Sequence, residues 1–316
     1  MSVAVASASQ KLAKEVCDLP LEEVACYLCQ SSERKLLVDD PPFQVHLCSG
    51  CGLGYTSPRL DGARIHEIYG DSYFNSASAE AYGYSSYETD LEGYLRTFRR
   101  KAKVISRHVA QGPVLEIGCA AGAFLEVMRE RDHEVWGVEI SRGILEAARN
   151  RCGFEKLFCG RLDEVVSELP KGRFDILAMF DVIEHLSDPL KELALCHELV
   201  SDGGVLVLQT QDVSSRTRRM LGSKWHHFKQ LEHIYHFSPV TIRDLLGRAG
   251  FEVVELTRRN AGKYVSFDFI GERLHRVAKI PRFLCQPLHW MGRRYLYVNP
   301  QDEMLVIAKK VKKPAG

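Results

Sequence analysis

The chain has 316 residues, of which 45% are hydrophobic and 26% are charged, and its 42 lysines and arginines almost balance its 41 acidic residues. This near-neutral charge argues against nucleic acid as a partner, and the apolar runs are too short to span a bilayer, so we expect no membrane partner either. The first residues do not read as a signal peptide, and ten cysteines without an export signal suit a reducing compartment, so we expect a cytoplasmic protein.

Four cysteines near the start form two CxxC pairs, Cys26 with Cys29 and Cys48 with Cys51, separated by 18 residues. Each CxxC turn can aim both sulfurs at one ion, so this spacing predicts a closed tetrahedral Zn²⁺ site. The residues between the pairs read as two strands joined by a turn at 39–42. We therefore predict an N-terminal extension at 1–22 and a structural zinc ribbon at 23–60, because four thiolates leave no open position for water.

Residues 61–105 are predicted to link the ribbon to the rest of the chain. Their first part is rich in tyrosine, and Tyr82, Tyr84 and Tyr87 suggest either a lid or packing between ribbon and core. Their second part has helical periodicity. We expect the basic residues of that helix on its solvated face: Arg96, Arg99, Arg100, Lys101 and Lys103.

The stretch VLEIGCAAGAF at 114–124 predicts a strand that passes directly into a helix. Small residues occupy every second position of the loop, at Gly118, Ala120 and Gly122, which lets a ligand approach the backbone closely. Glu116 stands two residues before the first of them. The loop therefore predicts a ligand site whose neighbourhood includes a carboxylate.

A second strand at 134–139 ends in Glu139, where an acidic side chain can accept both hydroxyls of a ribose. The ligand is then nucleotide-like, and two classes are open. A dinucleotide fits poorly, because Glu116 would repel its diphosphate. S-adenosylmethionine presents an ammonium and a sulfonium, so its charge suits Glu116 better.

Further strands are predicted at 155–158, 174–180 and 204–210, with helices between them, which indicates a doubly wound parallel sheet of the α/β class. The segments 251–259 and 303–310 read as a closing pair of strands. Between them, 262–300 is either a helical cap over the substrate or a packing insertion. We place the whole core at 106–311.

The segment LEIGCAAG resembles the first motif of the class I S-adenosylmethionine-dependent methyltransferases, [DE]-x-G-x-G-x-G, with Ala120 in place of the middle glycine. Residues 172–193 resemble the fourth strand of that family and the segment after it, and 233–256 resemble its late helix–strand unit. The chain also resembles a bacterial subgroup of this family that carries an N-terminal zinc ribbon. This resemblance implies a seven-stranded Rossmann-like sheet whose last strand is antiparallel.

The resemblance also implies residue roles for S-adenosylmethionine. Glu116 meets the methionine ammonium, and Glu139 holds the ribose. Phe180 and Asp181 line the floor at the end of the fourth strand. The remaining implied contacts wrap the cofactor or lie beside its adenine: Gly118, Cys119, Ala120, Gly122, Ile140 and Leu162.

Methyl transfer to a hydroxyl needs a base, because a neutral alcohol is a weak nucleophile. In DVIEH, Glu184 and His185 lie just beyond the fourth strand, at the carboxyl edge where ligands bind in such sheets. We predict His185 as the base and His233 as the next candidate. Alternatively, Asp181, Glu184 and His185 hold a divalent metal, as E-x-x-E-H does in some quinol and RNA-end methyltransferases.

We therefore expect a methyltransferase that acts on a small-molecule or carbohydrate-type acceptor. A quinol-type O-methyltransferase and an RNA methyltransferase are the enzymatic alternatives. A zinc-ribbon interaction protein with an inactive cofactor fold is the non-enzymatic one. The sequence leaves the oligomeric state open.

Overall fold

The computed structural model describes residues 20–61, 90–278, 280–292 and 294–311. The proposed tyrosine lid, with Tyr82, Tyr84 and Tyr87, lies outside the described residues. None of the helices within these ranges combines the length and the hydropathy that a membrane span requires.

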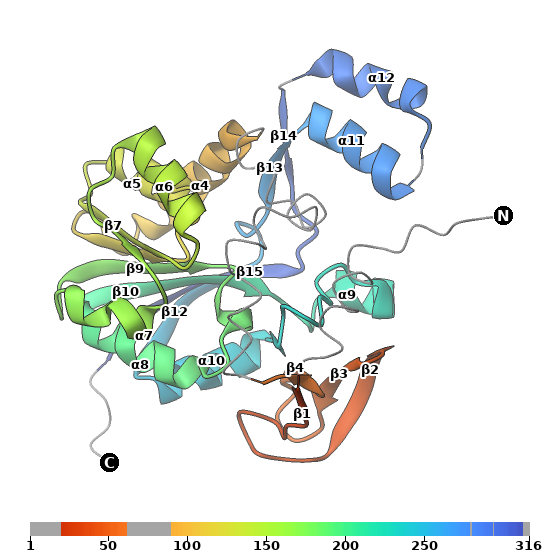
Figure 1. The fold of residues 1–316 in the computed structure, drawn as a ribbon, viewed down its shortest axis with the longest axis horizontal. Coiled ribbons are helices and arrows are strands. Elements are labelled where there is room, and N and C mark those ends of the chain that lie inside the picture. The colour runs from red at the N-terminus through yellow and green to blue at the C-terminus, as the bar shows by residue number, and fades with distance from the viewer. Residues whose placement is uncertain (1–19, 62–89, 279, 293, 312–316) are drawn as a thin grey trace.

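A seven-stranded sheet forms the centre of the molecule (Figure 1), with the spatial order β12-β15-β10-β9-β6-β7-β8. Five of its strands, from β10 to β8 in that order, run parallel, whereas β15 is antiparallel to both of its neighbours. The strands are β6 (Val114–Ile117), β7 (Val135–Glu139), β8 (Leu157–Cys159), β9 (Phe174–Phe180), β10 (Val200–Gln211), β12 (Phe251–Thr257) and β15 (Glu303–Lys310). The predicted α/β class, the seven strands and the antiparallel last strand are confirmed.

Helices cover both faces of this sheet (Figure 1) because its central strands are apolar on both sides. Phe124 and Leu145 pack on one face, and Leu193 and Ile242 pack on the other. The first layer holds α4 (Leu91–Ile105), α5 (Ala123–Arg129) and α6 (Arg142–Cys152). The second holds α7 (Leu162–Val165), α8 (Pro189–Leu199) and α10 (Pro239–Arg248).

The direction of winding reverses between β6 and β9. The chain moves outward from β6 to β7 and β8, then returns to place β9 on the other side of β6. In open α/β sheets, ligands bind at the carboxyl ends of the strands at such a switch point. The fold therefore locates the candidate site beyond Ile117 and Phe180, the last residues of these two strands.

The cysteine-rich segment forms a small sheet of its own with the order β11-β4-β3-β2. Its strands β2 (Arg34–Asp40), β3 (Phe43–Cys48) and β4 (Gly54–Thr56) come from the predicted ribbon. Its fourth strand, β11 (Tyr235–His236), belongs to the core. A two-residue pair, β1 (Leu21–Glu22) with β5 (Arg59–Leu60), closes the segment.

The interruption between β12 and β15 is a long hairpin. Its strands β13 (Lys263–Ser266) and β14 (Tyr295–Val298) pair antiparallel. They carry α11 (Phe267–Ala278) and α12 (Arg282–Met291) at their far end, away from the seven-stranded sheet (Figure 1). A short helix, α9 (Arg216–Leu221), follows β10.

Candidate cofactor and acceptor site

The loop between β6 and α5 takes a backbone conformation that requires small residues. Gly118, Ala120 and Gly122 have φ values of +71°, +43° and +75°. A Cβ atom on Gly118 would lie 2.6 Å from Cγ2 of Val182, and one on Gly122 would lie 2.8 Å from a ring carbon of Phe154. Both positions therefore need glycine for space as well as for backbone freedom.

Glu139 ties this loop to the end of β7. Its carboxylate accepts hydrogen bonds from the backbone N–H groups of Ala120, at 2.9 Å, and of Ser141, at 3.0 Å. The side chain is buried, which raises its pKa, while the backbone donors oppose that rise. Ile140 follows directly and is half-buried, so both residues stand beside the glycine-containing loop.

Glu116 is a buried carboxylate whose Oε2 has no hydrogen-bond partner in the described parts of the chain. Burial and the nearby Glu139 raise its pKa well above the ordinary value, and Lys101 opposes that rise. An unpaired buried acid is costly. Oε2 of Glu116 is therefore available to a hydrogen-bond donor or a cation that enters the site.

The end of β9 lies beside the end of β6 at the same edge of the sheet. The ring of Phe180 packs against Phe98 and Phe124, with centroid distances of 5.0 and 4.9 Å. Asp181 follows with a φ of +55°, which turns the chain sharply at the edge of the sheet. Two other implied contacts, Cys119 and Leu162, are buried and belong to the core clusters on the two faces.

Lys101 does not lie on a solvated face, and the expectation that it would is wrong. Its side chain is buried, and its ammonium lies 5.1 and 5.2 Å from the ring centroids of Phe98 and Phe180. Burial lowers its pKa to about 8, and Asp181 and Glu303 oppose that shift. Lys101 shares the helical stripe of buried residues that includes Thr97 and Val104, and this periodicity could have identified it.

We predict that Lys101→Met stabilises the free protein. The folded-state pKa of about 8 lies below the ordinary lysine value of 10.5, so folding disfavours the charged amine. The penalty is complete below pH 8 and disappears as the pH rises through 10.5. At neutral pH the variant should gain up to about 3 kcal/mol in unfolding free energy, measured by urea denaturation at several pH values. Lys103→Met, at an exposed position of the same helix, should change it little.

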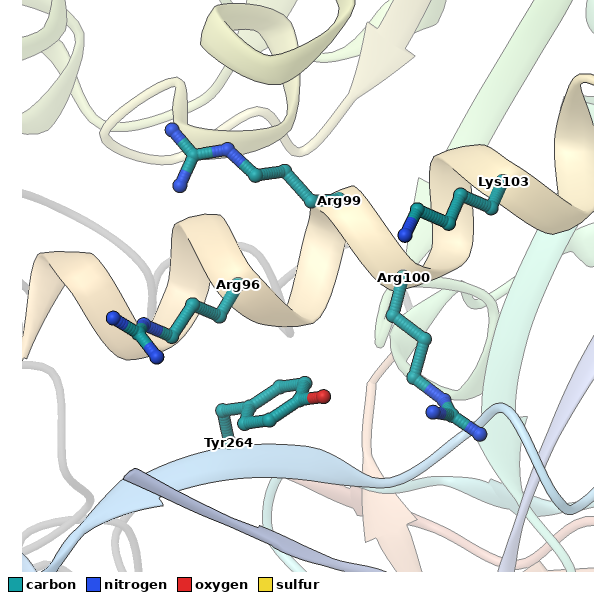
Figure 2. A pocket seen from close by; sticks show the side chains of 5 residues that line it. All are labelled: Arg96, Arg99, Arg100, Lys103 and Tyr264. Atoms are coloured by element: carbon teal, nitrogen blue, oxygen red, sulfur yellow. The ribbon is translucent and has the colours of Figure 1, made fainter. Parts of the chain in front are cut away.

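Of the other basic residues of α4, Arg96 and Lys103 are exposed as expected, whereas Arg99 and Arg100 are half-buried. Figure 2 shows Arg96 and Arg100 on the side of Tyr264, whereas Arg99 points the other way. Arg96 lies 4.8 Å from the ring centroid of Tyr295, and Arg100 lies 4.2 Å from that of Tyr297. These contacts join α4 to strand β14 of the hairpin.

Two histidines and a glutamate meet beyond the end of β9. Ligand atoms of Glu184, His185 and His233 all lie within 4.8 Å of one another. His185 Nδ1 lies 2.9 Å from the carbonyl oxygen of Glu232, and His233 Nδ1 lies 2.9 Å from that of His227. A carbonyl oxygen only accepts, so both Nδ1 atoms donate, and the lone pair of each ring is on Nε2.

Burial sets the protonation of this trio. It lowers the pKa of both histidines, and for His233 the neighbouring His185 lowers it further. Burial and then Asp181 raise the pKa of Glu184 well above its usual range, while Thr210 donates a 3.0 Å hydrogen bond to Oε2. The imidazoles are therefore neutral near pH 7, as a base or a metal ligand must be. Asp181, which was expected to join Glu184 and His185, is not part of the trio; His233 takes its place.

Lys263 and Glu303, which no sequence motif singled out, complete this edge of the sheet. Lys263 Nζ lies 3.4 Å from Glu303 Oε1 and 3.9 Å from Asp181 Oδ2. Gln209 donates a 2.8 Å hydrogen bond to Glu303 Oε2. Burial raises the pKa of Glu303 to about 7, although Lys263 opposes the rise. No local sequence pattern marks Lys263 or Glu303 as a site residue. Each is simply the first residue of a strand, β13 or β15, near the C-terminal end of the chain.

The four cysteines of the small sheet converge as predicted. Their sulfur atoms all lie within 4.8 Å of one another, and the pairs Cys26–Cys51 and Cys29–Cys48 are each 3.4 Å apart. Gly52, after the second pair, has a φ of +81°. Four thiols at these separations suit one tetrahedral ion whose bonds to sulfur are about 2.3 Å long.

Comparison with known proteins assigns the family. A family model described as a methyltransferase domain matches residues 87–256, which include the glycine loop, Glu139 and the Glu184–His185–His233 trio. The chain belongs to the class I S-adenosylmethionine-dependent methyltransferases.

Curated relatives match part of this methyltransferase. It is 29% identical over 151 residues to the ubiquinone biosynthesis O-methyltransferase of Ruegeria pomeroyi, and the match covers 45% of this chain and 60% of that protein. It is 28% identical over 128 residues to the malonyl-[acyl-carrier protein] O-methyltransferase of Serratia marcescens, with coverage of 40% and 49%. The chain thus spans less than two thirds of either relative.

Among solved structures, an S-adenosylmethionine-dependent methyltransferase from Archaeoglobus fulgidus aligns with 72% of this chain and 99% of that one. The TM-score is 0.47 and the sequence identity is 22%.

The residues of the methyltransferase fit the cofactor of its family. The unpartnered Oε2 of Glu116 suits the methionine ammonium of S-adenosylmethionine. The loop of Gly118 to Gly122 leaves no side chain between backbone and ligand, and Glu139 stands at the strand end where a ribose is held. The fit therefore rests on the acidic side chain of Glu116 and on the space that the loop of Gly118 to Gly122 leaves for a ligand.

Proposed function

We propose that this methyltransferase transfers a methyl group from S-adenosylmethionine to a hydroxyl of a small-molecule or carbohydrate-type acceptor. The observation that carries the proposal is the orphaned, buried carboxylate of Glu116 beside the glycine loop. Two matched relatives have O-methyltransferase in their names, which supports oxygen as the acceptor atom. Bound S-adenosylmethionine supplies a methyl group on a sulfonium sulfur. The neutral thioether that remains after transfer is a good leaving group.

In this proposal the cofactor is held by three sets of residues. Glu116 pairs with its ammonium and Glu139 accepts its ribose hydroxyls. Phe180 and Asp181 form the floor. The remaining residues wrap the cofactor or border its adenine: Gly118, Cys119, Ala120, Gly122, Ile140 and Leu162.

The chain itself has to orient the acceptor and remove its proton. Nε2 of His185 or of His233 takes the hydroxyl proton, since the carbonyl groups of Glu232 and His227 fix both rings with the lone pair on Nε2. Glu184 lies beside both rings, and in its carboxylate form it stabilises the imidazolium that forms. Burial keeps the imidazoles neutral until the pH falls below the ordinary histidine range.

We predict that His185→Gln lowers kcat by about 10² to 10⁴ and leaves the Kd for S-adenosylmethionine within about twofold, because the imidazole acts on the acceptor. His233→Gln is the matched comparison and identifies the base if His185→Gln retains activity. Steady-state kinetics and calorimetric titration measure the two quantities. Wild-type kcat in both variants would contradict a histidine base.

A divalent metal at Glu184, His185 and His233 is the second candidate role for this trio. Its support is that the three ligand atoms lie within 4.8 Å and that both rings are oriented by backbone carbonyls through Nδ1. Treatment with EDTA, followed by Mg²⁺ or Mn²⁺, separates the two roles. A base works without metal, whereas a metal centre loses activity and regains it on addition.

The acceptor can be found by an unbiased screen of metabolites. The purified enzyme is incubated with methyl-labelled S-adenosylmethionine and a metabolite extract, and products that gain one labelled methyl group are identified by mass spectrometry. A small-molecule product supports the proposal. A labelled RNA product would favour the RNA alternative, and saturable binding without any product would favour the non-enzymatic one.

We also propose that Cys26, Cys29, Cys48 and Cys51 hold one structural Zn²⁺. Their converging sulfur atoms support this ion, and four protein ligands leave it no catalytic position.

A further inference from the structure

The helix α12 carries two apolar faces, and the described residues of the chain cover only one of them. On the inner face, Cys285 is buried and Leu288 is half-buried, where α12 packs against α11. On the outer face, Phe283 is 72% exposed and Trp290 is 81% exposed. Soluble monomers rarely expose aromatic side chains this completely in one place.

The outer face is a continuous stripe. At 100° per residue, residues 283, 284, 287, 290 and 291 fall within an arc of about 120° of the helix. All five are exposed and none is charged: Phe283, Leu284, Pro287, Trp290 and Met291. We call these five residues the α12 stripe. Helix α12, which carries the stripe, lies at the end of the β13–β14 hairpin that is farthest from the seven-stranded sheet (Figure 1).

The segment that carries the stripe is basic. Residues 267–294 contain six lysines and arginines but only Asp268 and Glu272 as acids, a net charge of +4, whereas the whole chain has +1. Two of these basic side chains, Arg282 and Arg294, are exposed near the two ends of α12. An apolar stripe with a basic surround is typical of helices that lie in a membrane interface.

The charge also distinguishes between possible occupants. A second copy of the chain would bring two segments of charge +4 together, and this repulsion opposes a dimer through the stripe. An anionic phospholipid surface attracts each basic residue and accepts the aromatic rings at the level of its headgroups.

We propose that the α12 stripe docks this methyltransferase on anionic phospholipid membranes. Phe283, Leu284, Trp290 and Met291 enter the headgroup region, and Arg282 and Arg294 contact lipid phosphates. The helix lies in the interface and does not cross the bilayer. This surface departs from our expectation, drawn from the composition of the whole chain, that no membrane is a partner. It does not depend on the identity of the methyl acceptor.

Vesicle flotation tests the proposal with the full chain. One set of vesicles consists of phosphatidylcholine and the other of equal parts phosphatidylcholine and phosphatidylglycerol. The protein should float with the second set, and added salt should weaken binding. Because Trp290 is exposed, whereas Trp136 is half-buried and Trp225 is buried, tryptophan emission should shift to the blue when Trp290 enters the membrane interface. Trp290→Phe should retain flotation and lose the shift.

Matched variants locate the contact. Phe283→Ser combined with Trp290→Ser should weaken partitioning by at least about tenfold. Both positions are exposed, so circular dichroism and thermal melting should be unchanged. The control combines Met220→Ser with Val240→Ser, at positions that are 86% and 71% exposed on other helices. It should bind vesicles as the wild type does.

Several outcomes overturn the proposal. Failure of the wild type to float with either vesicle set excludes a lipid surface. Equal flotation of the stripe variant and the control shows that another surface binds. If light scattering finds a wild-type dimer that the stripe variant converts to a monomer, the occupant is a second copy.

Discussion

Replacing Glu116 by glutamine should weaken S-adenosylmethionine binding by about thirtyfold or more. The substitution keeps the size of the side chain and removes the charge that is proposed to pair with the methionine ammonium. Loss of one partner of a buried charge pair costs about 2–5 kcal/mol. Calorimetric titration measures the effect, and Glu168→Gln, an exposed carboxylate away from the loop, is the matched control.

The same variant should be at least as stable as the wild type without ligand, because it removes an unpaired buried acid. Binding to the wild type should also strengthen as the pH rises. Burial and Glu139 raise the pKa of Glu116 in the free protein, and the cation needs the carboxylate form. The variant should lack this pH dependence. A nicotinamide or flavin dinucleotide that bound more tightly than S-adenosylmethionine would contradict the assignment of residue 116.

Cys48→Ser should reduce the zinc content from one ion per chain to none and lower the melting temperature by on the order of 10 °C. The four sulfur atoms lie within 4.8 Å of one another, and the binding energy of a structural zinc is folding energy. Elemental analysis and scanning calorimetry measure the two effects. Cys159→Ser replaces an exposed thiol outside the cluster and should preserve both values. A reduced wild-type preparation that contains no zinc would contradict the zinc assignment.

The features that local sequence determines were predicted well. The strands at 174–180 and 303–310 have the observed bounds, because buried β-branched and aliphatic runs leave few alternatives. The glycine loop was also predicted, since Gly118 and Gly122 adopt backbone angles that other residues rarely take. The converging cysteines followed from the paired CxxC spacing alone.

The features that depend on distant contacts were not predicted. Lys101 was expected in solvent, because a lysine is rarely fully buried and its aromatic neighbour Phe180 is far away in sequence. Lys263 and Glu303 meet at the site only because the chain returns to the sheet after the hairpin. His233 was named as a candidate base, but its juxtaposition with Glu184 and His185 needed the tertiary fold.

The β4–β11 pairing makes the cysteine-rich segment a part of the core rather than an attachment to it. Tyr55 pairs with Tyr235 and Gly54 with His236, and Thr56 Oγ1 donates a 3.2 Å hydrogen bond to the carbonyl oxygen of His233. A truncation that began after residue 60 would strip the backbone partners from the strand that follows His233. Expressing the rest of the chain alone should therefore disturb first the region around His233, the candidate base. The four-stranded sheet is therefore complete only when both parts of the chain are present.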